Sequence, residues 1–90
     1  MNVKVKKRDG KLEDYEDKKI GRVVIACGLD SNETEKLVAE VNKWVKQFEG
    51  KTISSLLIRD KIIEVMPKYS KYSAEQYVWW EKYKDKHNLN

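Results

Sequence analysis

A cluster of basic residues at the start of the chain is the feature most able to do chemistry. The first eleven residues carry five Lys or Arg side chains and one acid, Asp9, whereas the other 79 residues carry 14 of each sign. The formal net charge of +4 therefore comes entirely from this leading segment. Such a local excess of positive charge around Lys7-Arg8-Asp9-Gly10 indicates a site for an anion. The alternative is a basic turn that keeps an edge strand soluble.

A β-hairpin is expected to position these basic residues. Val3 and Val5 alternate with lysines, which predicts a half-buried strand. Asp9-Gly10 then predicts a turn, because glycine tolerates the positive φ that a primed turn demands. A return strand follows through Leu12, so the basic side chains should lie near the tip of the hairpin.

Four amphipathic helices are expected after the hairpin. Their apolar positions repeat at three- and four-residue spacing, with capping residues before them and Gly or Pro after them. The expected helices run from about 17 to 27, from about 30 to Gly50, from Ser54 or Ser55 to Pro67, and from Ser73 to about Lys86. Ser73-Ala74-Glu75-Gln76 has the form of a capping box, and Thr52-Ile53 is a short β-prone piece. These elements predict one small α+β domain over residues 1–90, with its core at about 3–84.

The composition excludes several classes of protein. A chain of 90 residues buries only somewhat over ~60% of its unfolded surface, so it has little room for an enzymatic cleft. Cys27 is the single cysteine and His87 the single histidine, so neither a disulfide nor a cysteine zinc site can form within the chain. No glycine-rich P-loop and no Ser–His or Cys–His pair can be proposed, which predicts that the chain is not an enzyme. With no apolar run near ~20 residues and no signal peptide, a cytoplasmic protein without a membrane span is expected.

The opening residues carry a resemblance to a known family. Val5-Lys6-Lys7-Arg8-Asp9-Gly10, followed by Glu13, Tyr15 and Lys19-Ile20, resembles the first signature of the ATP-cone domain. Three later segments are also similar to that family: Ala26-Cys27-Gly28-Leu29, Thr52-Ile53-Ser54 with Ile58, and Ala74 with Tyr77. The resemblance covers about residues 3 to 84.

The resemblance implies both a fold and a function. The implied fold is a four-helix bundle capped by a small three-stranded sheet built on the N-terminal hairpin. The implied function is binding of ATP or dATP by an allosteric sensor, most often at the start of ribonucleotide reductases. The family also occurs in the transcriptional repressor of their genes, after a zinc ribbon that this sequence does not contain. We therefore expect a free-standing domain or one cut from a larger protein, acting through oligomerisation or on a partner enzyme such as ribonucleotide reductase.

The resemblance and the residue types together predict the side chains that contact nucleotide. Lys7 and Arg8 are suited to phosphate oxygens, and the Glu13 carboxylate can accept a hydrogen bond from the adenine amino group. Mg²⁺ would be carried by the phosphates. The predicted set is Val5, Lys7, Arg8, Glu13, Tyr15, Glu16, Lys19, Ile20, Thr52, Ile58, Arg59, Lys82 and Lys84.

Two positions depart from the family pattern. The family usually has Asp or Asn where this chain has Glu16, which bears on contacts to the base or ribose. The last helix of the family usually carries an aromatic residue followed by Arg, whereas here Trp80 is followed by Glu81. A phosphate contact from that helix would therefore come from Lys82 or Lys84.

Other interpretations of the same residues stay open. By residue type alone, Lys19 and Arg59 are ordinary solvated helix residues and Thr52 is a strand residue. A small RNA- or DNA-binding module is the alternative function, with the hairpin on phosphates and aromatic side chains stacked on bases. Against it, the basic and aromatic clusters lie at opposite ends of the sequence.

The aromatic cluster near the C-terminus is the second unusual feature. Six of the nine aromatic residues fall within residues 69–83. Trp79 and Trp80 point about 100° apart on a helix, so one small core cannot readily bury both. Either one packs inside and the other lies on the surface, or the pair forms a surface for a second copy or a partner enzyme.

Overall fold

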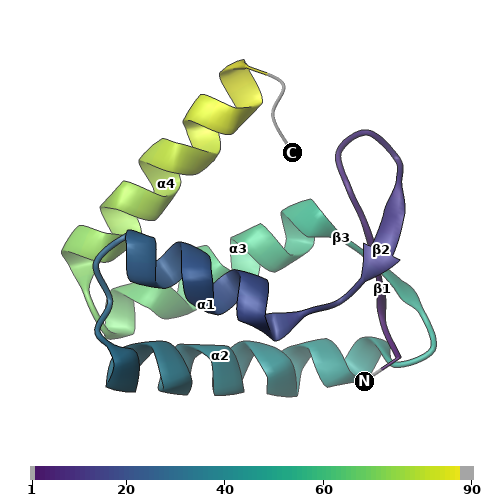
Figure 1. Ribbon diagram of the computed structural model, residues 1–90, viewed down its shortest axis with the longest axis horizontal. Helices are drawn as coiled ribbons and strands as arrows, with labels where there is room; N and C mark the ends of the chain where they lie inside the picture. The colour runs from purple at the N-terminus through teal and green to yellow at the C-terminus, as the bar shows by residue number, and fades with distance from the viewer. Residues whose placement is uncertain (1, 88–90) are drawn as a thin grey trace.

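A small mixed sheet forms one end of the molecule (Figure 1). In the computed structural model, which describes residues 2–87, β1 (Lys4–Lys6) pairs antiparallel with β2 (Leu12–Asp14). It pairs in parallel with β3 (Thr52–Ser54), so the strand order is β2-β1-β3. Val5 and its β3 neighbour Ile53 are both buried, which gives this part of the sheet one face toward the core.

The hairpin turn is held by three hydrogen bonds. The Gly10 N–H donates to the Lys7 carbonyl at 2.9 Å, and the Lys7 N–H donates to the Lys11 carbonyl at 2.8 Å. The Asp9 carboxylate accepts from the Lys11 N–H at 3.0 Å. Gly10 has φ +86°, the left-handed region that glycine enters at little cost. The expected hairpin is confirmed, but its turn runs from Lys7 to Gly10 and is longer than Asp9-Gly10 alone.

Four α-helices follow in the described chain. They are α1 (Asp17–Ala26), α2 (Ser31–Val45), α3 (Ser55–Val65) and α4 (Lys71–Lys86), with short 3₁₀ turns η1 (Lys46–Phe48) after α2 and η2 (Met66–Lys68) after α3. Asp30 and Glu33 form a reciprocal capping box at the start of α2, and the Ser54 hydroxyl accepts from the Leu56 N–H at the start of α3. Local capping chemistry therefore sets the start of both helices, as expected from the sequence.

Helix α4 begins earlier than expected. Ser70 is its N-cap, because the Ser70 hydroxyl accepts from the Ser73 N–H at 3.1 Å. Ser73 is only 1% exposed and lies against Gly28, where an added Cβ would be 3.1 Å from the Ser73 hydroxyl oxygen. The expected capping box at Ser73 is wrong, because Ser70 takes the capping position and the contact with Gly28 places Ser73 inside the fold.

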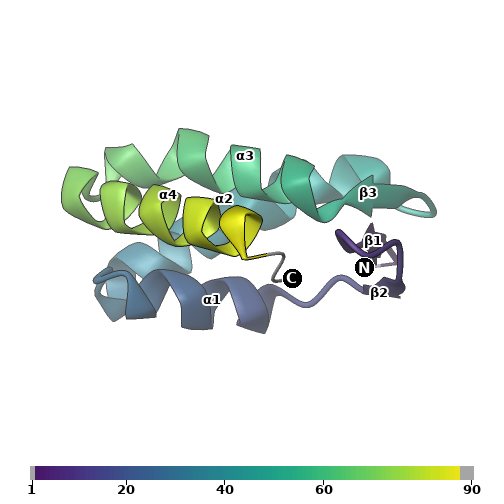
Figure 2. The same cartoon turned by 90° about the horizontal axis from the view of Figure 1, so that it is seen from above.

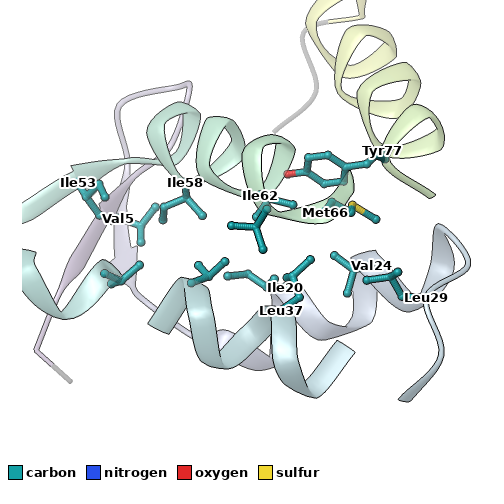
Figure 3. Close-up of a cluster of buried hydrophobic side chains, with 14 of the residues drawn as sticks. Val5, Ile20, Val24, Leu29, Leu37, Ile53, Ile58, Ile62, Met66 and Tyr77 are labelled. Atoms are coloured by element: carbon teal, nitrogen blue, oxygen red, sulfur yellow. The ribbon is translucent and has the colours of Figure 1, made fainter. Parts of the chain in front are cut away.

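The hydrophobic core lies between the sheet and the first three helices (Figure 3). Val24 of α1 and Leu37, Val41 and Val45 of α2 are completely buried. Burial of each such side chain contributes roughly 1.5–3 kcal/mol. Helix α4 adds only Ala74 and Tyr77 to this core, so it is fastened mainly by its N-terminal half.

Helix α4 diverges from the rest of the molecule toward its C-terminus (Figure 1). Seen from above, it lies between α1 and α3 (Figure 2). The α+β class, the helices and the three-stranded sheet led by N-terminal strands agree with the sequence-based expectation. A four-helix bundle is not confirmed, because α4 leaves its neighbours along much of its length.

Candidate functional site

A pocket opens between the hairpin, the start of α1, and one side of α3 and α4. Its cavity measures about 150 Å³. Apolar side chains from three helices form part of its lining: Ile20, Val23, Ile58, Ile62 and Tyr77. The hairpin supplies Val5, Lys7 and Arg8 to the same space. An apolar floor beside a basic edge can hold a ligand that is flat and apolar at one end and anionic at the other.

Five cationic side chains surround this pocket. The hairpin supplies Lys7 and Arg8, while α1, α3 and α4 supply Lys19, Arg59 and Lys84 in that order. The hydrogen-bonded turn fixes the backbone of Lys7 and places Arg8 beside it, so little ordering is needed before an anion binds there. Arg8 and Lys84 are largely buried, with side chains 19% and 20% exposed. The positive charge that stands out in the sequence is therefore joined by cations from distant parts of the chain.

Glu13 lies between two of these cations, Lys7 and Lys19. Its carboxylate is 3.2 Å from Lys19 Nζ and 3.6 Å from Lys7 Nζ. The hydrogen bond from Lys19 holds the pKa of Glu13 below its usual value, and the charge of Lys7 adds to the effect. Glu13 is therefore an ionised acceptor at neutral pH.

The α4 side of the pocket is acidic where it meets the arginines. Arg8 Nη2 lies 3.0 Å from Glu81 Oε1, and Arg8 also pairs with Asp85. Arg59 Nη1 lies 3.5 Å from the second oxygen of Asp85. Lys84 pairs with Glu81 at 3.2 Å. A chain of ion pairs therefore connects the hairpin and α3 to the last turns of α4.

Tyr15 forms another part of the pocket lining. Its hydroxyl donates to Asn42 Oδ1 at 2.7 Å, and Asn42 Nδ2 donates to Asp17 at 2.9 Å. Burial, with the nearby charge of Asp17, raises the pKa of Tyr15 to about 12. Tyr15 is thus a neutral, hydrogen-bonded wall. Glu16 beside it is exposed and lines the pocket.

Most of the residues predicted from the sequence gather at this pocket. Eleven of the thirteen line it: Val5, Lys7, Arg8, Glu13, Tyr15, Glu16, Lys19, Ile20, Ile58, Arg59 and Lys84. Thr52 and Lys82 do not. Thr52 is exposed on β3, opposite Lys4, while Lys82 lies beside Trp79 at a different pocket. Nucleotide contacts by any of these residues stay a prediction.

Sequence reasoning missed the acidic residues of α4 as part of the site. Glu81 lines the pocket with a side chain only 8% exposed, and Asp85 pairs with both arginines. A signal existed, because Tyr77, Glu81 and Lys84 follow helical spacing and share one face of α4. The residues Asp14, Val23, Ser55, Leu56 and Ile62 also line the pocket without having been predicted.

A resident metal site is not evident. Within residues 2–87, His, Cys, Asp and Glu side chains form no cluster of three or more that could hold a metal ion. The same part of the chain contains no helix long and apolar enough to cross a bilayer. Burial, with the nearby Glu81 carboxylate, raises the pKa of the Cys27 thiol, which lowers its reactivity.

One family model matches the chain. The family model of the ATP cone domain matches residues 3–86, nearly the whole chain. The chain therefore belongs to the ATP-cone family, whose domains bind adenine nucleotides and regulate rather than catalyse. No curated protein matches the chain significantly.

Proposed function

We propose that this protein is a cytoplasmic regulatory module that binds ATP or dATP in the pocket between the hairpin, α3 and α4. Mg²⁺ would enter with the phosphates. The observation that carries the proposal is the meeting of five cations and an apolar floor in one pocket of an ATP-cone domain. Its output is a changed association state or a changed partner enzyme such as ribonucleotide reductase.

The phosphates are assigned to the basic edge. Lys7 and Arg8 meet them from the hairpin, while Arg59 and Lys84 lie across the pocket. Charge-assisted hydrogen bonds contribute roughly 1.5–3 kcal/mol each. Three or four of them, with burial of the base on the apolar floor, suffice for a micromolar complex at about −8 kcal/mol.

Titration calorimetry tests the proposal directly. The protein is titrated with Mg-ATP, Mg-dATP, Mg-GTP and a short single-stranded RNA at two salt concentrations. We expect ATP and dATP to bind, with affinities that change less with salt concentration than the affinity for RNA does. RNA binding that falls steeply with salt and is not displaced by ATP would support a nucleic-acid-binding module instead.

Glu13 is expected to select adenine. A carboxylate accepts from the adenine amino group but repels the guanine carbonyl, so GTP should bind at least ten-fold more weakly than ATP. In the Glu13→Gln variant, an amide that both donates and accepts should reduce this preference to near unity. The measurement is competition of ATP and GTP for both proteins. Equal affinity for the two nucleotides in the wild type would contradict the assignment.

The two proposed roles of neighbouring residues set a geometric condition. Glu13 and Lys7 lie 3.6 Å apart, closer than the base and the phosphates of one nucleotide. Both roles therefore require the Lys7 side chain to swing from Glu13 toward Arg8. Two variants test this condition. Lys7→Ala should lose ATP affinity and keep the adenine preference, whereas Glu13→Gln should lose the adenine preference. If the two residues shared one role, each variant would lose both properties.

The exposed aromatic residues of α4 are the proposed surface for association. Trp79 and Trp80 are 62% and 38% exposed, so the core buries neither, and both stack on Tyr83 with ring centroids 5.7 and 5.4 Å apart. Such a patch is typical of an interface. Nucleotide should shift the association state, and ATP and dATP can differ in effect if they differ in affinity for the two states.

Light scattering measures this prediction. Wild type, Trp79→Ala and Trp80→Ala are compared without nucleotide and with millimolar ATP or dATP. We expect a larger species in at least one nucleotide state, lost or weakened in both variants. A strict monomer in every condition would exclude self-association and leave a partner protein for this surface.

A further inference from the structure

The contact between the α4 carboxylates and the pocket arginines has the form of an internal competitor for phosphate. Arg8 is held by Glu81 at 3.0 Å and by Asp85, and Arg59 is held by Asp85 at 3.5 Å. These are the two guanidinium groups of the pocket, and an arginine fork binds carboxylate and phosphate with the same donors. Phosphate oxygens and α4 carboxylates therefore compete for one set of N–H groups.

The C-terminal half of α4 depends on these ion pairs. Among the described residues of α4 that follow Tyr77, Glu81 is the buried one, and its burial is against Arg8 and Lys84. Trp79, Trp80 and Tyr83 are exposed instead. Figure 1 shows this half of the helix standing away from α3. Loss of the ion pairs should leave it attached mainly through Tyr77 and Ala74 at its base.

The size and charge of the pocket also indicate that the α4 wall moves when a nucleotide binds. At about 150 Å³, it is smaller than the roughly 300–1,000 Å³ of typical ligand sites, so it encloses only part of a nucleotide unless one wall moves. If the carboxylates kept their present positions, a bound triphosphate would lie next to two like charges, which is unfavourable in a partly desolvated site. The α4 wall combines weak attachment with this repulsion.

We propose that Glu81 and Asp85 form a latch that occupies Arg8 and Arg59 in the free protein, and that nucleotide phosphates displace it. This inference rests on the proposed function of the pocket. Exchange of carboxylate for phosphate frees the last turns of α4, which carry Trp80 and Tyr83. Binding inside the pocket thereby changes the surface that the aromatic patch presents. The latch also lowers the affinity for nucleotide, because the phosphates must first displace it.

The sign of a mutational effect separates a latch from a binding residue. Asp85→Asn removes one latch charge at a side chain that is 48% exposed, so the fold should persist. We expect this variant to bind ATP roughly two- to five-fold more tightly than wild type, the range expected for a partly exposed ion pair. The double variant Glu81→Gln/Asp85→Asn should bind roughly ten-fold more tightly, because it removes both carboxylates that the phosphates must displace. Glu75→Gln is the matched control, because it removes the same charge from an exposed position of α4 outside the ion-pair chain.

Calorimetry of these variants is combined with hydrogen exchange over residues 81–86. Exchange there should be faster in Asp85→Asn without ligand, and faster in wild type once Mg-ATP or inorganic tripolyphosphate is bound. Affinity in Asp85→Asn that equals or falls below that of Glu75→Gln would overturn the latch, as would ATP bound to wild type with no change in exchange. Failure of ATP to bind, with tripolyphosphate still freeing α4, would overturn the proposed nucleotide function and support the latch.

Discussion

Replacing Arg8 by alanine is expected to weaken ATP binding ten-fold or more. Arg8 lines the pocket from a hydrogen-bonded turn, and the loss of one charge-assisted contact costs about 1.5–3 kcal/mol. Loss of the Arg8 ion pairs offsets only part of this loss, because Asp85 still pairs with Arg59 and Glu81 still pairs with Lys84. Lys7→Ala should show a loss of similar size. Calorimetric titration with Mg-ATP measures both variants.

Two further variants keep this experiment interpretable. Lys6→Ala removes one positive charge from an exposed strand residue that does not line the pocket, and it should leave the affinity nearly unchanged. Arg8→Ala/Glu81→Gln removes the carboxylate that Arg8→Ala leaves buried beside Lys84, so it controls for damage to the fold. Unchanged ATP affinity in both Arg8→Ala and Lys7→Ala would rule out the hairpin as the phosphate site.

Replacing Tyr77 by alanine is expected to cost about 3–5 kcal/mol of unfolding free energy. The side chain is 5% exposed and is the largest group that joins α4 to the core (Figure 3). Truncation of a buried aromatic residue loses its transfer free energy and leaves a cavity. Because small domains are stable by only about 5–15 kcal/mol, this loss is a large fraction of the total stability. Urea unfolding followed by circular dichroism measures the change.

The matched control is Tyr77→Phe. This variant keeps the buried aromatic ring and removes only the hydroxyl, so it should change stability far less than Tyr77→Ala does. A loss below 1 kcal/mol for Tyr77→Ala would mean that α4 is fastened elsewhere.

Helix α4 brings three functions of the molecule together on different faces. Tyr77 anchors it in the core, Glu81 faces the pocket, and Trp79 is exposed on the outer surface. A ligand that displaces this helix from the pocket would therefore alter its outer surface within the same element. This arrangement explains how so small a domain could transmit binding without a second core.

The sequence by itself determined the local elements and the family. Gly10 marked the turn of the hairpin, residues 30–32 the capped start of α2, and Thr52-Ile53 the strand β3. These signals are readable because glycine conformation, helix capping and strand alternation depend on residues a few positions apart. The basic opening segment likewise indicated the basic edge of the pocket, since five positive charges within eleven residues lie close together in any fold.

Only the tertiary structure decided which residues of α4 lie across the pocket from the basic hairpin. Ser70 rather than Ser73 caps α4, because packing against Gly28 buries Ser73. Lys84 rather than Lys82 reaches the pocket, because the angle of α4 turns one face inward. Glu81 meets Arg8 across 73 positions of sequence. No local propensity encodes a contact of that separation, since it exists only after the core of α1, α2 and α3 has placed α4 beside the hairpin.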